Sequence, residues 1–366
     1  MTSGLKVPRD LTEITPLWLT QVLDFVHGRP GMSVTGYSAE AIVEGKGFMN
    51  RLFRLELEYG PGSVDLPRTV VAKLPSADPT LRSVFDRMRQ NRREVMFYRE
   101  LVDQIQLPVP VSYHCGMAPD SEDTVLLLED LSSGRQGNSV TGCSMAEARA
   151  CIGQLARFQA AWWESPLLDS LHWMPLREAE AGAYLEIHDE AWGALIEKAG
   201  CGMPQGLRLL GDRLTPLVRK IKAKLTRLPR TIVHGDYRLD NCFFPDESAA
   251  RQVVAFDWEF CVRGRGVYDV ATFISEAFPP QKRREAEMGL LREYHAVLVD
   301  GGVRGYSFQE CLHDYRVSML EIFVFWVITG GYCNYEGERA RAYLINTLER
   351  LDAAISDLDS IATLDL

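Results

Sequence analysis

The sequence predicts an α+β protein in which a small antiparallel sheet with a helix is followed by a larger, mainly helical region. Between residues 51 and 59, apolar and charged side chains alternate with a period of two, the pattern of an antiparallel strand with one buried face. A β-branched run at 69–75 and an apolar run at 124–131 predict two more strands. Beyond residue 144, apolar residues recur at helical spacing. Strands therefore precede helices, which is typical of α+β folds.

The stretch 132–138 is polar, contains two glycines and is the most linker-like part of the chain. We expect it to separate two lobes. The first would span 1–131, with a helical extension at 1–30, and the second 132–366.

Five helix expectations follow from apolar periodicity and start signals. Asp10 and Glu13 form a capping-box pattern, which predicts that the first helix begins there. The stretch from 81 to 102 predicts a helix in the first lobe. Segments 283–299, 307–329 and 339–358 predict three more in the second lobe.

Composition narrows the possible function. The chain has 366 residues, 46% of them hydrophobic and 25% charged, as in soluble globular proteins. A formal charge of -10 argues against nucleic acid or anionic lipid as a partner. The eight cysteines form no C-x-x-C pair, which disfavours structural zinc. A polar amino-terminal stretch and the lack of an apolar run near 20 residues predict a cytoplasmic protein with reduced thiols and no membrane anchor. Its oligomeric state would be monomer or homodimer.

Two short segments gather the residue types of a chemical site. The apolar run that starts at Ile232 breaks into a polar loop with His234, Asp236 and Asn241, and then turns apolar again. A second apolar run ends in Asp257. We expect the segments to form a hairpin with these polar groups at one end.

This set of residue types fits phosphoryl transfer. The reaction needs a carboxylate that orients the attacking hydroxyl and takes its proton, which Asp236 can supply. It also needs oxygen ligands for Mg²⁺, which Asn241 and Asp257 can supply. Taken alone, each motif could equally be a tight turn or a strand-end carboxylate.

The pattern His-Gly-Asp-x-x-x-x-Asn, followed by an apolar strand that ends in Asp257-Trp258, resembles the aminoglycoside phosphotransferase and choline-kinase-like family, including its ecdysteroid-kinase-like branch. The resemblance implies a protein-kinase-like fold with two lobes. It also implies transfer of the γ-phosphate of ATP, or alternatively GTP, with Mg²⁺, to a hydroxyl of a small molecule. His234 would then support the loop by hydrogen bonding. Arg238 stands where protein kinases often carry lysine and could neutralise charge on the phosphate.

Upstream residues extend the resemblance. Lys73, near the end of a strand, and Glu94, on the following helix, are similar to the kinase pair in which glutamate positions the lysine on the nucleotide phosphates. Gly45 and Gly47 lie between two predicted strands, where a glycine hairpin can approach phosphates closely, although an ordinary turn fits equally well. Further implied adenine contacts are the backbone groups near Glu129 and Leu131.

The resemblance leaves the acceptor open among aminoglycoside-, choline-, macrolide- and steroid-like alcohols. Farther along, Asp269 is expected to begin a helix and cap its free amides. A nucleotide-binding pseudokinase or scaffold is the alternative function. A protein kinase is disfavoured because the chain has no Ala-Pro-Glu or Asp-Phe-Gly motif.

Overall fold

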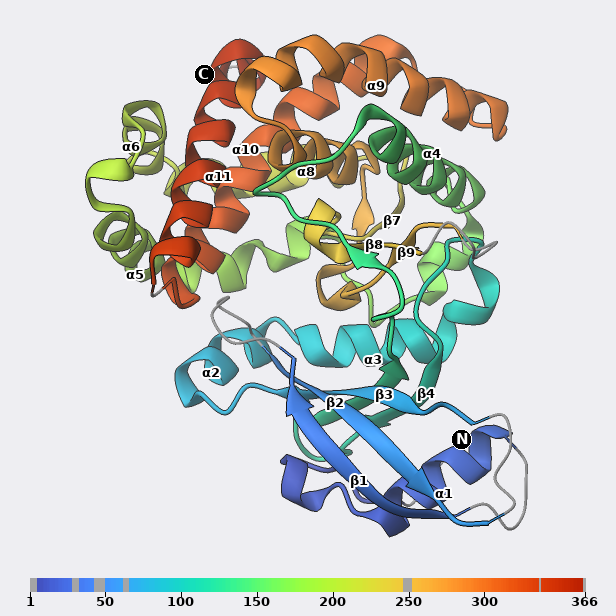
Figure 1. Ribbon diagram of the computed structural model, residues 1–366. Coiled ribbons are helices and arrows are strands. Elements are labelled where there is room, and N and C mark those ends of the chain that lie inside the picture. The colour runs from blue at the N-terminus through green and yellow to red at the C-terminus, as the bar shows by residue number, and fades with distance from the viewer. Residues whose placement is uncertain are drawn as a thin grey trace. The chain divides into compact units, whose positions relative to one another are not determined.

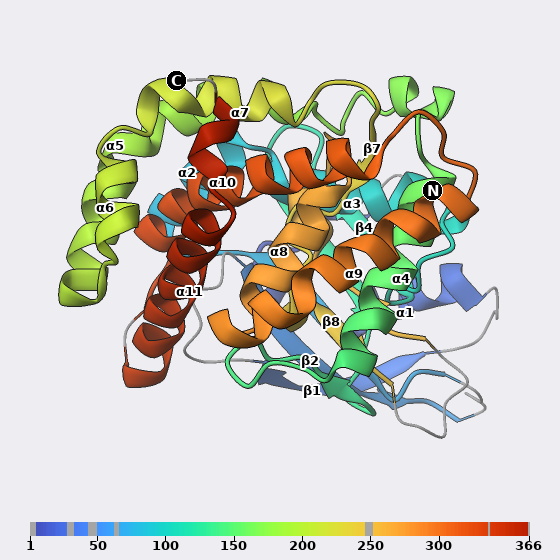
Figure 2. The same ribbon diagram turned by 90° about the horizontal axis from the view of Figure 1, so that it is seen from above.

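A computed structural model describes residues 5–27, 33–42, 50–61, 66–245, 252–335 and 337–364. The chain forms two compact units. Unit 1 comprises Met1–Gln104 and Val109–Gly134, and unit 2 comprises Ile105–Pro108 and Arg135–Leu366. Together they are of the predicted α+β class, with a small antiparallel sheet in unit 1 and a mainly helical unit 2 (Figures 1 and 2).

Unit 1 is built on a five-stranded antiparallel sheet with the strand order β1-β2-β3-β5-β4 (Figure 1). The three strands predicted at 51–59, 69–75 and 124–131 are present with nearly the expected limits, as β2 (Asn50–Tyr59), β3 (Thr69–Pro75) and β5 (Thr124–Glu129). Strands β1 (Val34–Ala41) and β4 (Ser112–Met117) complete the sheet.

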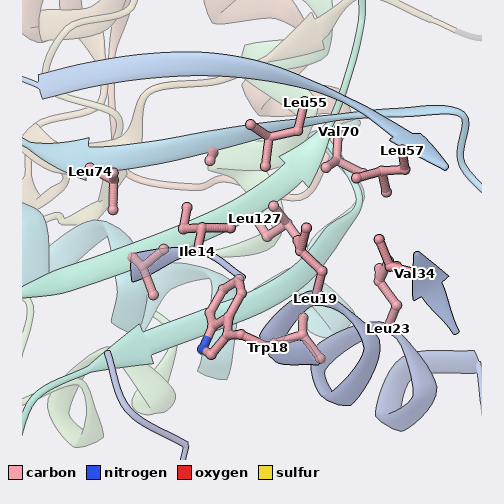
Figure 3. Close-up of a cluster of buried hydrophobic side chains, with 13 residues drawn as sticks. Ile14, Trp18, Leu19, Leu23, Val34, Leu55, Leu57, Val70, Leu74 and Leu127 are labelled. Atoms are coloured by element: carbon pink, nitrogen blue, oxygen red, sulfur yellow. The ribbon is translucent and has the colours of Figure 1, made fainter. Parts of the chain in front are cut away.

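One face of this sheet carries the core of unit 1. Helix α1 (Pro16–His27) packs against β1 and β4 and buries Trp18 and Leu19 among the alternate apolar residues of β3 and β5 (Figure 3). Each fully buried side chain of this size contributes about 1.5–3 kcal/mol of apolar transfer free energy. Because side chains alternate along a strand, burying Val70 and Leu74 on this face directs Lys73 to the opposite face.

The first-lobe helices differ from the expectation in two places. Asp10 caps only a short 3-10 turn (Leu11–Glu13), and α1 begins later, where the Thr15 hydroxyl accepts from the backbone of Trp18. The predicted helix from 81 to 102 is two helices, α2 (Pro79–Arg87) and α3 (Gln90–Glu100). Arg89 separates them with a φ of 54°, which turns the chain out of the right-handed helical region.

Unit 2 consists mainly of helices, and α10 (Phe308–Tyr332) is buried along most of its length between α5, α7, α8 and α11 (Figure 2). The three helices expected near the carboxyl terminus are present. The remaining major helices are α4 (Met145–Ala161), α5 (Ala181–Ala199), α6 (Gln205–Gly211), α7 (Val218–Lys224), α8 (Val267–Ala277), α9 (Pro280–Asp300) and α11 (Glu338–Asp357). Among the helices formed by described residues, none combines the length and apolar character that a membrane crossing requires.

Short strands in unit 2 flank the predicted chemical residues. Strands β8 (Cys242–Phe244) and β9 (Val254–Ala255) pair antiparallel as the expected hairpin, and β6 (Arg135–Gln136) joins them on the other side of β8. Strand β7 (Thr231–Val233) pairs instead with β10 (Val262–Gly264). The polar loop after β7 therefore connects two small sheets.

Candidate active site

Lys73 and Glu94 meet within unit 1. Lys73 points from β3 to the face of the sheet opposite α1, and its Nζ lies 2.5 Å from Oε2 of Glu94 on α3. Both side chains are buried, with exposed fractions of 10% and 2%. A buried ion pair of this kind is retained only where each charge compensates the other, since removal of one partner leaves an unpaired buried charge.

Of the other nucleotide-site residues predicted in unit 1, the structure describes Glu129 and Leu131. The backbone N–H of Glu129 donates to the carbonyl of Val111 at 2.8 Å, so this donor is already used within the unit. The carbonyl of Leu131 accepts from the N–H of Gly134 at 3.1 Å. Gly45 and Gly47 lie outside the described residues. Adenine recognition near residues 129–131 stays a prediction.

In unit 2, Gly235 shapes the polar loop that follows β7. Its φ is +88°, a conformation that side chains other than glycine rarely adopt. A Cβ at this position would also overlap the backbone carbonyl oxygen of Phe260. The loop can therefore turn sharply after β7 only because residue 235 has no side chain.

Asp269 holds this turn from α8. Its two carboxylate oxygens accept the backbone N–H groups of His234, at 2.8 Å, and of Gly235, at 2.9 Å. The expectation that Asp269 caps its own helix is wrong, because its carboxylate is used by the loop instead. Burial raises the pKa of Asp269 to about 7, while the backbone donors of Gly235 and His234 act in the opposite direction.

Gln159 on α4 supports Asp269. Its amide nitrogen donates to Oδ2 of Asp269 at 2.9 Å, and its amide oxygen accepts from the hydroxyl of Tyr294 at 2.7 Å. Gln159 is fully buried, so its uncharged amide donates a hydrogen bond to the carboxylate of Asp269 at a position that solvent does not reach.

The ring of His234 is fully buried and both nitrogens are engaged. Nε2 lies 3.0 Å from the carbonyl oxygen of Phe256, which can only accept, so Nε2 carries the proton. Nδ1 then accepts from the backbone N–H of Asp236 at 3.3 Å. The ring also packs on Trp258, with centroids 4.4 Å apart. These contacts tie the loop to the segment that leads to Asp257.

Asp236 and Asn241 form the centre of the arrangement. The amide nitrogen of Asn241 donates to Oδ2 and to the backbone carbonyl of Asp236, each at 2.9 Å. Arg238 lies on the same oxygen, with Nε 3.2 Å from Oδ2. Oδ1 takes part in none of these contacts. Burial raises the pKa of Asp236 to about 6, opposed by Arg238 and reinforced by Asp257.

Asp257 follows β9 and lies near the same carboxylate. The β8–β9 pairing brings the two segments together, and the backbone N–H of Phe256 donates to the carbonyl of Asn241 at 3.1 Å. Asp257 has a φ of 70°, in the left-handed region that aspartate tolerates better than most residues but still at a cost. Such a conformation persists only where the surroundings fix it.

The structure adds contacts that sequence analysis missed. Arg238 donates to the hydroxyl of Tyr343 on α11. Glu276 on α8 is buried and accepts from the indole of Trp326 on α10 at 2.9 Å. A carboxylate inside the stretch 270–278, which has no other charged residue, is a sequence signal for Glu276. Nothing in the sequence connects Tyr343 to the loop.

The predicted residues thus form two groups. Lys73 and Glu94 come together in unit 1, while His234, Asp236, Arg238, Asn241 and Asp257 come together in unit 2. The second group offers a carboxylate with one oxygen that accepts no hydrogen bond from the described residues, an amide whose carbonyl oxygen can bind a cation, and a second carboxylate. These are the components that orient a hydroxyl and bind a divalent cation.

Comparison with known proteins gives the family context. A profile of the phosphotransferase enzyme family matches residues 64–306. A search of curated proteins finds no match to this chain.

Solved structures resemble the chain over most of its length. An ethanolamine kinase from Plasmodium vivax is 11% identical, with a TM-score of 0.56 over 92% of this chain and 87% of that chain. A choline/ethanolamine kinase family protein from Mesorhizobium loti is 15% identical, with a TM-score of 0.51 over 94% and 97%. The GDP complex of aminoglycoside 2'-phosphotransferase-IIIa is 16% identical, with a TM-score of 0.51 over 94% and 99%. These similarities confirm the predicted kinase-like fold.

Proposed function

Because the chain belongs to the phosphotransferase enzyme family, we propose that it transfers the γ-phosphate of ATP to a hydroxyl group of a small molecule. The observation that carries this proposal is the hydrogen bond from Asn241 to Asp236, with Asp257 close to the same carboxylate. The proposed base and the two proposed oxygen ligands would then belong to one loop system.

Asp236 would act on the acceptor. Arg238 and Asn241 both contact Oδ2, so Oδ1 is the atom left to accept a hydrogen bond from the acceptor hydroxyl. The proton of that hydroxyl would pass to Oδ1 as the oxygen attacks phosphorus. A raised pKa makes Asp236 a stronger base than an exposed aspartate, because burial disfavours its charged form.

Asn241 and Asp257 fit a Mg²⁺ site by their chemistry. Since the amide nitrogen of Asn241 donates to Asp236, its carbonyl oxygen is the ligand that remains, and Asp257 adds a carboxylate. Mg²⁺ prefers this small set of protein oxygens together with phosphate and water oxygens. When bound, the ion would neutralise charge on the phosphates.

Lys73 would bind the nucleotide phosphates, with Glu94 holding its ammonium group in place through their 2.5 Å ion pair. Arg238 would neutralise charge on the transferring phosphate. His234 would act by positioning, since its two ring nitrogens already bond to the loop and to Phe256.

The proposal is tested by an activity screen that varies both the nucleotide donor and the acceptor alcohol. A structurally similar phosphotransferase was solved with GDP, so GTP stays beside ATP as a candidate donor. The purified protein should be incubated with each nucleotide and Mg²⁺ against aminoglycosides, choline and ethanolamine, macrolides and hydroxysteroids, with phosphorylated products detected by mass spectrometry.

Two outcomes separate the candidate functions. A phosphorylated product that requires nucleotide and Mg²⁺ supports the kinase. Tight nucleotide binding by calorimetry, without product and without nucleotide hydrolysis, would instead support the nucleotide-binding scaffold.

A further inference from the structure

A cavity of about 490 Å³ lies in unit 2 where three segments meet. Its walls come from the end of α4 with the turn that follows, from the turn before β7, and from the turn after α9. Its volume lies within the range of cavities that hold small molecules. The residues that line it include none of His234, Asp236, Arg238, Asn241 and Asp257. The cavity is therefore a candidate for a second ligand site.

The carboxyl terminus of α9 is compensated by a cation. Arg304, in the turn after the helix, donates through Nη1 to the carbonyl oxygens of Val299, at 2.8 Å, and Val303, at 2.9 Å. A positive charge is favourable there, because the last carbonyl groups of a helix carry partial negative charge. The charge of Arg304 is thus used at the end of α9, although the residue lines the cavity.

The carboxyl terminus of α4 lacks such a cation. A Cβ on Gly301 would lie 2.6 Å from the Cβ of Ala160, so the end of α4 approaches the turn after α9 closely. The last turn of α4 contains no basic residue, and the acidic Glu164 follows the helix. An acidic group at this end adds to the negative end of the helix dipole, which is unfavourable. This side of the cavity therefore carries negative charge that a bound cation would compensate.

Glu164 is held in place by the segment that leads into β7. Its backbone N–H donates to the carbonyl of Arg230 at 2.8 Å, and its Oε1 accepts from the backbone N–H of Arg230. The guanidinium of Arg230 donates to the carbonyl of Thr226. Within the part of the chain that the structure describes, Oε2 of Glu164 takes part in no hydrogen bond or ion pair. One oxygen of a tethered carboxylate is thus available to a ligand.

The other walls of the cavity are aromatic and apolar. Trp163 packs on Tyr306 with ring centroids 5.0 Å apart, which holds its indole ring in the wall. Leu228 also lines the cavity and is 63% exposed, so its side chain has apolar surface that a ligand can cover. An indole ring attracts a cation over its face, and apolar surface favours an apolar ligand.

We propose that this cavity binds an organic ammonium ion with an apolar body, of the arylalkylamine class. The ammonium group donates to Oε2 of Glu164 and compensates the carboxyl terminus of α4, while the apolar body packs on Trp163 and Leu228. The net charge of -10 attracts cations from solution. The inference goes beyond the proposed function, because the ligand needs no hydroxyl and is bound by residues that take no part in the proposed transfer.

Three compounds with the same ring test the charge of the ligand: phenethylamine is a cation, phenylalanine a zwitterion and 3-phenylpropionate an anion. Each is titrated into the isotope-labelled full chain, with binding followed at the indole N–H resonance of Trp163, which Trp163→Phe identifies. Phenethylamine should bind at least about tenfold more tightly than 3-phenylpropionate, with phenylalanine between them. Equal affinities, or no shift with phenethylamine at millimolar concentrations, would overturn the proposal.

Glu164→Gln tests the contact with the ammonium group. Glutamine keeps the oxygen that accepts from Arg230 and removes only the charge, so the fold should be retained. Affinity for phenethylamine should fall about tenfold. The control Glu349→Gln, an exposed change on α11, should bind phenethylamine as wild type does. An unchanged affinity in Glu164→Gln contradicts the proposal.

Asp236→Asn separates the cavity from the proposed acceptor site. Phenethylamine has no hydroxyl to phosphorylate, and this variant should bind it with unchanged affinity. Hydrogen exchange of the wild type should slow on binding in the segments 160–164, 228–231 and 300–305. Loss of binding in Asp236→Asn, with exchange slowed at 234–241 instead, would place the amine at the catalytic loop and refute the cavity site. These results are the same whether or not the protein proves to transfer phosphate.

Discussion

The side-chain amide of Asn241 donates to both the carboxylate and the backbone carbonyl of Asp236, each at 2.9 Å. This double contact fixes the rotamer of the proposed base and the orientation of the amide. One residue therefore connects the acceptor side of the proposed reaction with the cation side.

Asn241→Ala should lower kcat by at least about 100-fold, because it removes a donor to Asp236 and a proposed Mg²⁺ ligand together. Steady-state kinetics across a Mg²⁺ series should show a higher Mg²⁺ requirement. Asn346→Ala, on α11, is the matched control and should behave as wild type. An unchanged Mg²⁺ dependence would argue against Asn241 as a ligand.

Lys73→Met should destabilise the protein by about 3–5 kcal/mol, because the buried carboxylate of Glu94 would lose the positive charge of Lys73. The double variant Lys73→Met/Glu94→Gln should recover much of that stability in urea unfolding but no activity. The exposed pair Arg149–Glu293 is the control, and its removal should cost at most about 1 kcal/mol. Recovery of activity in the double variant would contradict the proposed role of Lys73.

Gly235→Ala should abolish activity and destabilise the loop for two reasons. The new Cβ would overlap the carbonyl oxygen of Phe260, and alanine rarely adopts the positive φ of this position. Gly302→Ala isolates the second effect, because Gly302 also has a positive φ but open space around it. It should cost only about 1–3 kcal/mol and leave kcat unchanged. Equal effects of the two substitutions on kcat would show that the close approach at Gly235 does not matter.

Glu276→Gln should stabilise the protein above pH 7. Burial, opposed by Arg238, raises the pKa of Glu276 from 4.5 to about 7, so the folded state disfavours the charged form that the unfolded chain adopts freely. As pH rises from 4.5 to 7, the folded protein progressively loses the stability that the protonated carboxyl of Glu276 provides. Above pH 7 the ionised carboxylate lowers the free energy of unfolding by roughly 3 kcal/mol.

Urea unfolding at pH 5 and pH 8 measures this effect. The gain from Glu276→Gln should be large at pH 8 and small at pH 5, whereas the control Glu349→Gln should change stability little at either pH. A gain that is larger at pH 5 would mean that the carboxylate is held ionised in the folded protein.

Features set by local sequence could be predicted. Asp236 and Asn241 share one short loop, and Asp257 ends the next strand, so their proximity follows from the β8–β9 hairpin. The alternation of β3 and the spacing of α3 likewise place Lys73 and Glu94 on facing elements.

Features set by tertiary packing could not be predicted. Asp269 looked like a helix cap because its carboxylate partners, His234 and Gly235, come from a distant segment. Tyr343 reaches Arg238 from a helix more than a hundred residues away. The break between α2 and α3 occurs at Arg89, which is neither glycine nor proline. The usual helix-breaking residues are therefore absent there, and the sequence did not indicate the break.

The central claim is that Asp236 is the base of a phosphoryl transfer, and the most direct measurement compares Asp236→Asn with wild type in both transfer rate and nucleotide affinity. We predict a loss of transfer by at least about 1000-fold with nucleotide affinity retained, while the exposed control Asp300→Asn keeps both. Transfer by Asp236→Asn at a rate near that of wild type would contradict the account.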